Sequence, residues 1–203
     1  MEAKIGINQR IPMTTLELAL KAVLDGQYDE VYAEELVRMD YHGENRINKA
    51  VRIVSKLTRL NPLMPYMMDN AEKVKLALKN DDDKSLILIA LVNASYEFCY
   101  DVTTTLGKYF HAQKEVRSSL IVSKLSSKYG TNRSLPNGLY CILPMLLEEG
   151  FLLRPQMGVY QIKKLEPQTS IALETYKLSF FQNNPMLTDS YQCENHFYFE
   201  FIK

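Results

Sequence analysis

Residues 143–162 contain the pattern that decides the fold, LPMLLEEGFLLRPQMGVYQI. The stretch begins as an apolar helix and stops at Gly150, a residue type that commonly follows a helix. Two runs of alternating side chains, 151–154 and 159–163, then flank a turn that contains proline and glycine. Alternation around such a turn is typical of a β-hairpin. We therefore expect a helix, kinked at Pro144, that leads directly into a hairpin.

A second helix and a short turn precede this unit. Residues 115–119 enter a helix that ends at Tyr129-Gly130, and Ser134 is well placed to cap the next helix. The order helix, turn, helix, hairpin, with the motif L-x-x-x-G-F-L at 146–152, resembles the winged helix-turn-helix superfamily over residues 115–164. The resemblance implies a DNA-binding fold, although winged helices also serve as protein-interaction modules.

The same resemblance implies three sets of contacts to DNA. The first set faces the major groove from the start of the second helix: Arg133, Ser134, Asn137 and Tyr140. The second set lies on the wing: Arg154, Gln156, Gln161, Lys163 and Lys164. The third set, beside the first helix, binds backbone phosphates: Lys114, Arg117, Lys124 and Lys128. Because no basic residue lies between Ser134 and Glu149, we expect phosphate contacts to outweigh base contacts, unless this winged helix is a degenerate, structural one.

Charge is balanced over the chain, with 24 basic and 24 acidic residues, but it is unevenly distributed. Residues 44–64 carry five basic side chains and one acidic, and residues 103–164 carry nine and three. The segments around these two blocks are acidic. Because a polyanion responds to the potential within roughly 8 Å at physiological salt, a neutral total does not exclude nucleic acid as a partner.

The first basic block coincides with an amphipathic helix predicted over 44–60. At 100° per residue, five cations fall within an arc of about 140°, with the apolar residues roughly opposite. These cations are Arg46, Lys49, Arg52, Lys56 and Arg59. Like charges at such spacing repel one another, so an acid-free row favours a phosphate-contacting helix. The alternatives are a face that docks an acidic protein partner, a face that is simply solvated, and a face that pairs with the acidic helix expected over 29–39.

The remaining segments complete an α+β fold that is mainly α. We expect an N-terminal helical unit of helix-turn-helix type over residues 1–83, and a second unit over 84–203. The second unit would contain a buried helix over 84–110, apolar nearly all round, and the winged helix-turn-helix with a short antiparallel sheet. The aromatic, alternating end at 195–203 predicts a strand that joins the hairpin as its third member.

The layout of the whole chain carries a further resemblance. A basic helix ending in R-L-N-P-L at 59–63 precedes an apolar central helix, a winged-helix-like segment and a terminal strand. This order, within about 200 residues, is similar to the small accessory protein family of bacterial BREX phage-defence systems. The resemblance implies DNA binding without catalysis, and other proteins of the same system as partners.

Several classes of protein are disfavoured by the residues present. Three widely spaced cysteines fit reduced thiols in the cytoplasm, and the longest apolar run is too short for a membrane span. No phosphate-binding loop, nucleophile elbow or zinc motif is present, so we expect no catalytic residues, cofactor or metal. The sequence therefore predicts a non-catalytic protein that binds double-stranded DNA mainly through phosphates. The alternative is a protein-interaction scaffold whose basic stripe docks an acidic partner.

Overall fold

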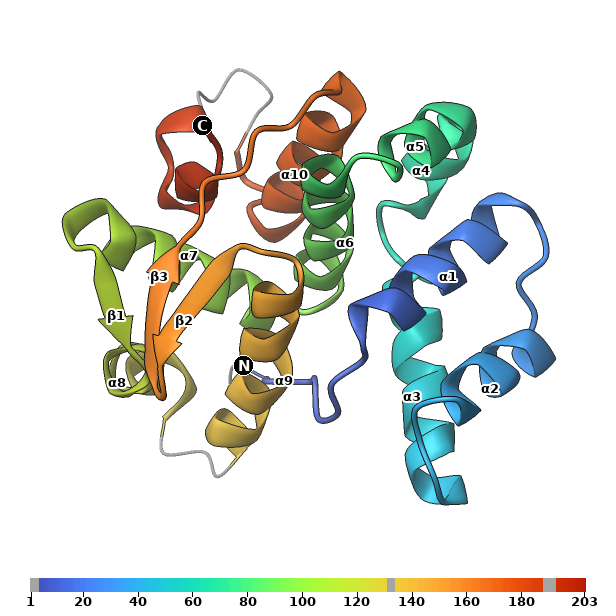
Figure 1. Cartoon of the computed structure of the whole chain (residues 1–203), viewed down its shortest axis with the longest axis horizontal. Helices are drawn as coiled ribbons and strands as arrows, with labels where there is room; N and C mark the ends of the chain where they lie inside the picture. Colours follow the sequence, from blue (N-terminus) through green and yellow to red (C-terminus); the bar gives the residue numbers. More distant parts are fainter. Residues whose placement is uncertain (1–3, 131–133, 188–192) are drawn as a thin grey trace.

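The computed structural model describes residues 4–130, 134–187 and 193–203. The fold is mainly helical, with 67% of residues in helices, and contains a small three-stranded antiparallel sheet. Figure 1 shows helices α1 to α3 on one side of the molecule and the sheet on the other, with α6, α9 and α10 between them. This arrangement confirms the predicted α+β class with a helical N-terminal half. The boundary predicted at residue 83 stays a prediction.

The N-terminal half consists of five helices in chain order: α1 (Met13–Leu24), α2 (Glu30–Arg38), α3 (Glu44–Leu57), α4 (Met64–Asp69) and α5 (Ala71–Ala77). The helices predicted over 29–39 and 44–60 are confirmed as α2 and α3. Gly43 separates α2 from α3 with φ +87°, a backbone conformation that glycine adopts without strain. α3 ends three residues earlier than expected, because Thr58 leaves the helical conformation and buried Asn61 donates a hydrogen bond to the carbonyl of Leu57.

The long helix predicted over 84–110 is two helices, α6 (Asp81–Ser95) and α7 (Glu97–Ala112). The break lies at Tyr96, whose backbone is extended with φ −135° and ψ 107°. Contacts from the end of α3 hold this junction: the Ser95 hydroxyl donates to the carbonyl of Lys56, and the Lys56 ammonium lies 4.0 Å from the centre of the Tyr96 ring. Both helices are largely buried, as an apolar circumference predicts.

The second half contains the sheet and its helices: β1 (Glu115–Arg117), α8 (Ser118–Tyr129), α9 (Ser134–Glu148), β2 (Leu152–Gln156), β3 (Val159–Ile162) and α10 (Ser170–Asn183). The predicted hairpin is confirmed as β2 paired with β3. The prediction of its third strand was wrong, because β1 takes that place in the order β1-β3-β2.

The C-terminal residues form 3₁₀ helices, η1 (Cys193–Asn195) and η2 (Phe197–Phe201), where a strand was predicted. Only Ile202 touches extended backbone, through a single bridge to Leu165. A 3₁₀ helix has three residues per turn, so Tyr198 and Phe201 share one face, and both are fully buried. Tyr198 stacks on Tyr176 of α10 with ring centres 4.3 Å apart. The aromatic side chains of η2 are thus removed from water by packing against α7 and α10, and no strand pairing is needed to bury them.

Within the described residues, no helix has the length and apolar character that crossing a membrane requires.

Candidate nucleic-acid interface

The predicted basic face of α3 is exposed along its whole length. All five cations from Arg46 to Arg59 are exposed, although Arg59 lies beyond the end of α3 at Leu57. Ile47, Ala50 and Val54 on the opposite side of the helix are buried in the core. No carboxylate of residues 4–130, 134–187 or 193–203 forms an ion pair with any of the five. We call these residues the α3 cation row.

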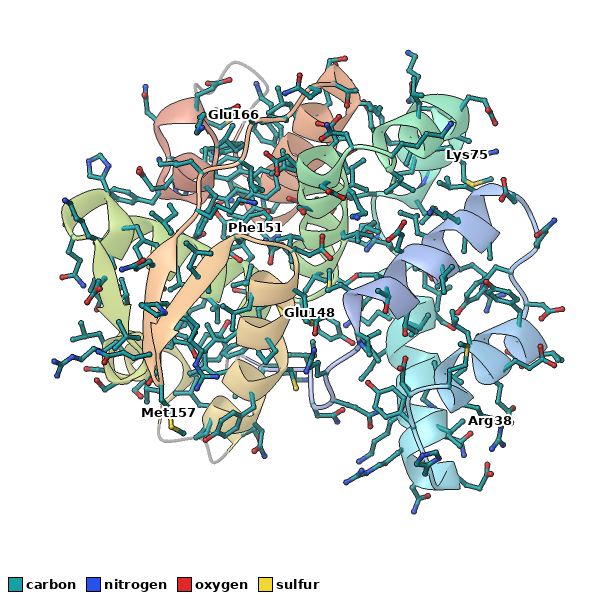
Figure 2. The ribbon with its side chains drawn as sticks, viewed as in Figure 1. Arg38, Lys75, Glu148, Phe151, Met157 and Glu166 are labelled. Atoms are coloured by element: carbon teal, nitrogen blue, oxygen red, sulfur yellow. The ribbon has the colours of Figure 1, made fainter. Side chains whose placement is uncertain are left out.

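Two acidic residues of this region, Glu34 and Glu44, form ion pairs with Arg38 and do not neutralise the α3 cation row. Arg38 of α2 binds Glu34 at 2.5 Å and also Glu44, the acid in the first turn of α3, at 3.0 Å. Figure 2 shows Arg38 on α2 at the outer side of the helical half. The acidic second helix, which sequence analysis considered as a partner for the row, therefore pairs through Arg38 instead.

Lys56 differs from the other members of the row. Its ammonium lies over the Tyr96 ring, and desolvation by partial burial lowers its pKa. A cation held against an aromatic face is less available to a phosphate than one in water. Arg46, Lys49, Arg52 and Arg59 are therefore the stronger candidates for phosphate contacts.

The second predicted zone is divided by its ion pairs. Lys128 binds Asp101 at 2.6 Å and Glu97 at 2.8 Å, and Lys163 lies 4.0 Å from Asp82. Among the predicted contacts of this zone, those that are exposed and have no ion-pair partner among the described residues are Lys114, Arg117, Lys124 and Arg154. Lys108 of the same block is also exposed and lies 5.9 Å from the centre of the Phe197 ring. Asn137 is exposed on α9, and the prediction for Arg133 falls outside the described residues.

Strand register separates these residues further. Arg117 is opposite Val159, next to the hairpin turn, whereas Glu115 is opposite Gln161 at the other end of the sheet. Lys114 and Lys163 therefore lie at the end away from the turn. The turn end, labelled at Met157 in Figure 2, and the beginning of α3 both lie in the lower part of the view, but on opposite sides of the molecule. The sheet thus places Arg117 near the turn and leaves Lys114 and Lys163 at its other end.

An apolar groove lies along α9 beside the hairpin, and sequence analysis did not anticipate it. It encloses about 370 Å³, and its walls come from α8, α9 and the β2–β3 hairpin. Tyr140 and Met157 line it while remaining 76% and 88% exposed. Arg154 is its one cation among the described lining residues. The signal in the sequence was the combination of apolar residues with a lack of charge along residues 134–147.

The described residues contain neither a cluster of metal-ligating side chains nor an activated cysteine. In residues 4–130, 134–187 and 193–203, no three His, Cys, Asp or Glu side chains are grouped as a metal site requires. Cys99, Cys141 and Cys193 are buried free thiols, and burial raises the pKa of each. A raised thiol pKa disfavours the reactive thiolate at neutral pH.

Comparison of the chain with protein-family models, with curated proteins and with solved structures finds no match.

Proposed function

We propose that this protein binds double-stranded DNA without catalysis, chiefly through backbone phosphates. The observation that carries the proposal is the α3 cation row, which is exposed and free of ion pairs with the described carboxylates. Three cations on one face of α3 and Arg59 just beyond its end, together with Arg117, Lys124 and Arg154 of the other half, form the type of surface that releases condensed counterions from DNA. Contacts of this kind favour affinity over sequence discrimination.

The topology of the second half supports a winged helix as part of this proposal. Helix α7, strand β1, helices α8 and α9, and the β2–β3 hairpin follow one another, and β1 pairs with the hairpin. In this reading α9 is the recognition helix and exposes Asn137 and Tyr140, with no cation of its own. We therefore expect weak base preference. The resemblance to the BREX accessory family extends the proposal to a phage-defence factor in the bacterial cytoplasm that works with other proteins of its system.

The proposal is tested by fluorescence anisotropy with a labelled random duplex at several salt concentrations. We expect the wild type to bind with a steep log–log dependence on salt. Arg46→Glu/Arg52→Glu removes two phosphate contacts and should lower the salt slope by about 1.8, from roughly 0.9 per contact. The matched control Lys73→Glu/Lys79→Glu makes the same charge change at two exposed residues on or beside α5. Absence of binding by the wild type, or equal loss in both double variants, would contradict the proposal.

A second candidate function is docking of an acidic protein partner. The apolar groove beside α9 favours it, because exposed Tyr140 and Met157 offer apolar contact area next to Arg154. A partner helix with apolar and acidic faces would fit such a surface. The two candidates differ in their response to Tyr140→Ser/Met157→Ser: DNA binding through the α3 cation row should persist, whereas protein docking should be lost.

A further inference from the structure

A polar hollow lies where the chain segment before α1 passes the beginning of α3. It encloses about 550 Å³, and the lining residues used below are Asn8, Gln9, Arg10, Asp40, Arg46 and Lys49. Two of these belong to the α3 cation row, and the other four come from segments that precede α3 in the sequence. The hollow is therefore a concave part of the basic surface, where the rest of the α3 cation row lies along a convex helix.

Hydrogen bonds hold the walls of the hollow in place. The Gln9 side-chain amide donates to the carbonyl of Arg46 at 3.1 Å, which ties the segment to α3. The Tyr41 hydroxyl donates to the carbonyl of Arg10. On the other side, Glu148 at the end of α9 accepts from the backbone N–H of Met13 at 3.0 Å; Figure 2 labels this residue between α9 and α1. The segment is thus tied to both halves of the molecule.

Two of the cations in the hollow have no ion-pair partner among the described residues. Arg10 forms an ion pair with Glu148, and the carboxylate of Asp40 accepts a hydrogen bond from the Thr15 hydroxyl at 2.5 Å. Arg46 and Lys49 form no ion pair with any described carboxylate, and they are three residues apart on one helix face. Asp40 keeps its negative charge, because the Thr15 hydroxyl is neutral, so Arg46 and Lys49 leave the hollow with one net positive charge. The side-chain amide of Asn8 adds a neutral hydrogen-bonding group.

We propose that this hollow binds a phosphate group, held by Arg46 and Lys49 with Asn8 at the rim. The guanidinium of Arg46 can present two parallel N–H donors to phosphate oxygens, and Lys49 supplies a compact charge beside it. The proposal rests on the proposed function where the phosphate belongs to the DNA backbone. The same chemistry suits the phosphate of a free nucleotide, so the experiment separates the two sources.

The first measurement compares two variants that each add one carboxylate. Asn8→Glu places it inside the hollow without removing a cation, and Ser170→Glu places it at an exposed position of α10, a helix that carries none of the proposed phosphate contacts. If the hollow holds a DNA phosphate, Asn8→Glu should weaken binding about eightfold at 0.1 M salt, the electrostatic gain from one contact. Ser170→Glu should weaken it about threefold at most, because salt screens a charge that is remote from the contacts. Thermal unfolding of both variants checks that each remains folded.

The second measurement titrates inorganic phosphate, and then a nucleoside monophosphate, into the wild type and Arg46→Gln/Lys49→Gln by calorimetry. If Asn8→Glu and Ser170→Glu bind DNA with equal affinity while the wild type also binds, the hollow would be overturned and DNA binding would stand. Phosphate or nucleotide binding that the double variant loses, in a wild type that binds no DNA, would support the hollow and refute the proposed function. A wild type that binds neither DNA nor phosphate or nucleotide would refute both the phosphate site in the hollow and the proposed function.

Discussion

Replacing Gly107 with alanine should destabilise the protein, because α7 and η2 approach each other too closely for a side chain. A Cβ atom at this position would lie 1.9 Å from the carbonyl oxygen of Phe197 and 3.3 Å from the Cβ of Glu200. Ordinary contact begins at 3.4 Å, so the backbone of η2 would have to move by about 1.5 Å. That segment carries Tyr198 and Phe201, which are fully buried, so the shift would disturb the aromatic packing on α10.

Two opposing effects set the size of the change. Alanine stabilises a helix interior by about 1 kcal/mol relative to glycine. Overpacking a well-packed core costs about 1–3 kcal/mol and sometimes more, and the obstacle here is backbone, which yields less than the tip of a side chain. We expect a net loss of about 2 kcal/mol in the free energy of unfolding. For a chain of this length the melting temperature should fall by about 4–8 °C.

Thermal and urea unfolding, monitored by circular dichroism, measure this change. Lys124→Ala provides the control, because it introduces alanine at an exposed position of α8, away from η2, and should alter stability by about 0.5 kcal/mol at most. A Gly107→Ala variant as stable as the wild type, or more stable, would show that helix propensity outweighs the contact. The close packing of α7 against η2 would then be refuted.

Two further changes test the core and its pH dependence. Asn61→Ala removes a buried amide that donates to the carbonyls of Leu57 at 3.0 Å and Leu91 at 2.8 Å. The free energy of unfolding should fall by about 3 kcal/mol, because both buried carbonyls lose this donor. A fall of less than about 1 kcal/mol in urea denaturation would contradict this role. Burial raises the pKa of Glu149 above its ordinary value of 4.5, so the folded protein keeps this proton to a higher pH than the unfolded chain does. The free energy of unfolding therefore falls as the pH rises from 4.5 through the pKa of the folded state. Glu149→Gln should therefore be more stable than the wild type in urea at pH 7 and equal to it near pH 4, whereas an equal difference at both pH values would exclude burial of the charge as the cause.

Local signals in the sequence were sufficient for most elements. Helices α2 and α3 and the β2–β3 hairpin were predicted because their ends carry glycine or proline and their apolar residues repeat with a clear period. The prediction failed at Tyr96 and at residues 195–203. In both places, residues distant in sequence decide the backbone: the end of α3 packs against Tyr96, and α7 and α10 bury the aromatic side chains of η2.

The candidate interface divides in the same way. Periodicity alone placed five cations on one face of a helix over 44–60. The structure confirms that all five are exposed, but Arg59 lies beyond the end of α3. Periodicity could not show that Lys128 meets Asp101, 27 residues earlier, or that Gln9 bonds to Arg46 across 37 residues. These contacts decide which cations are already neutralised and where the surface is hollowed.

The amphipathic α3, with its acid-free row, follows from the amino-acid sequence by itself, because the angle between side chains on a helix depends only on their spacing. Which of the cations meet a carboxylate, and whether they line a concave or a convex surface, depends on the tertiary structure. Electrostatic attraction varies with the distance between charges in space, and only folding brings Glu148, Arg10 and the beginning of α3 together.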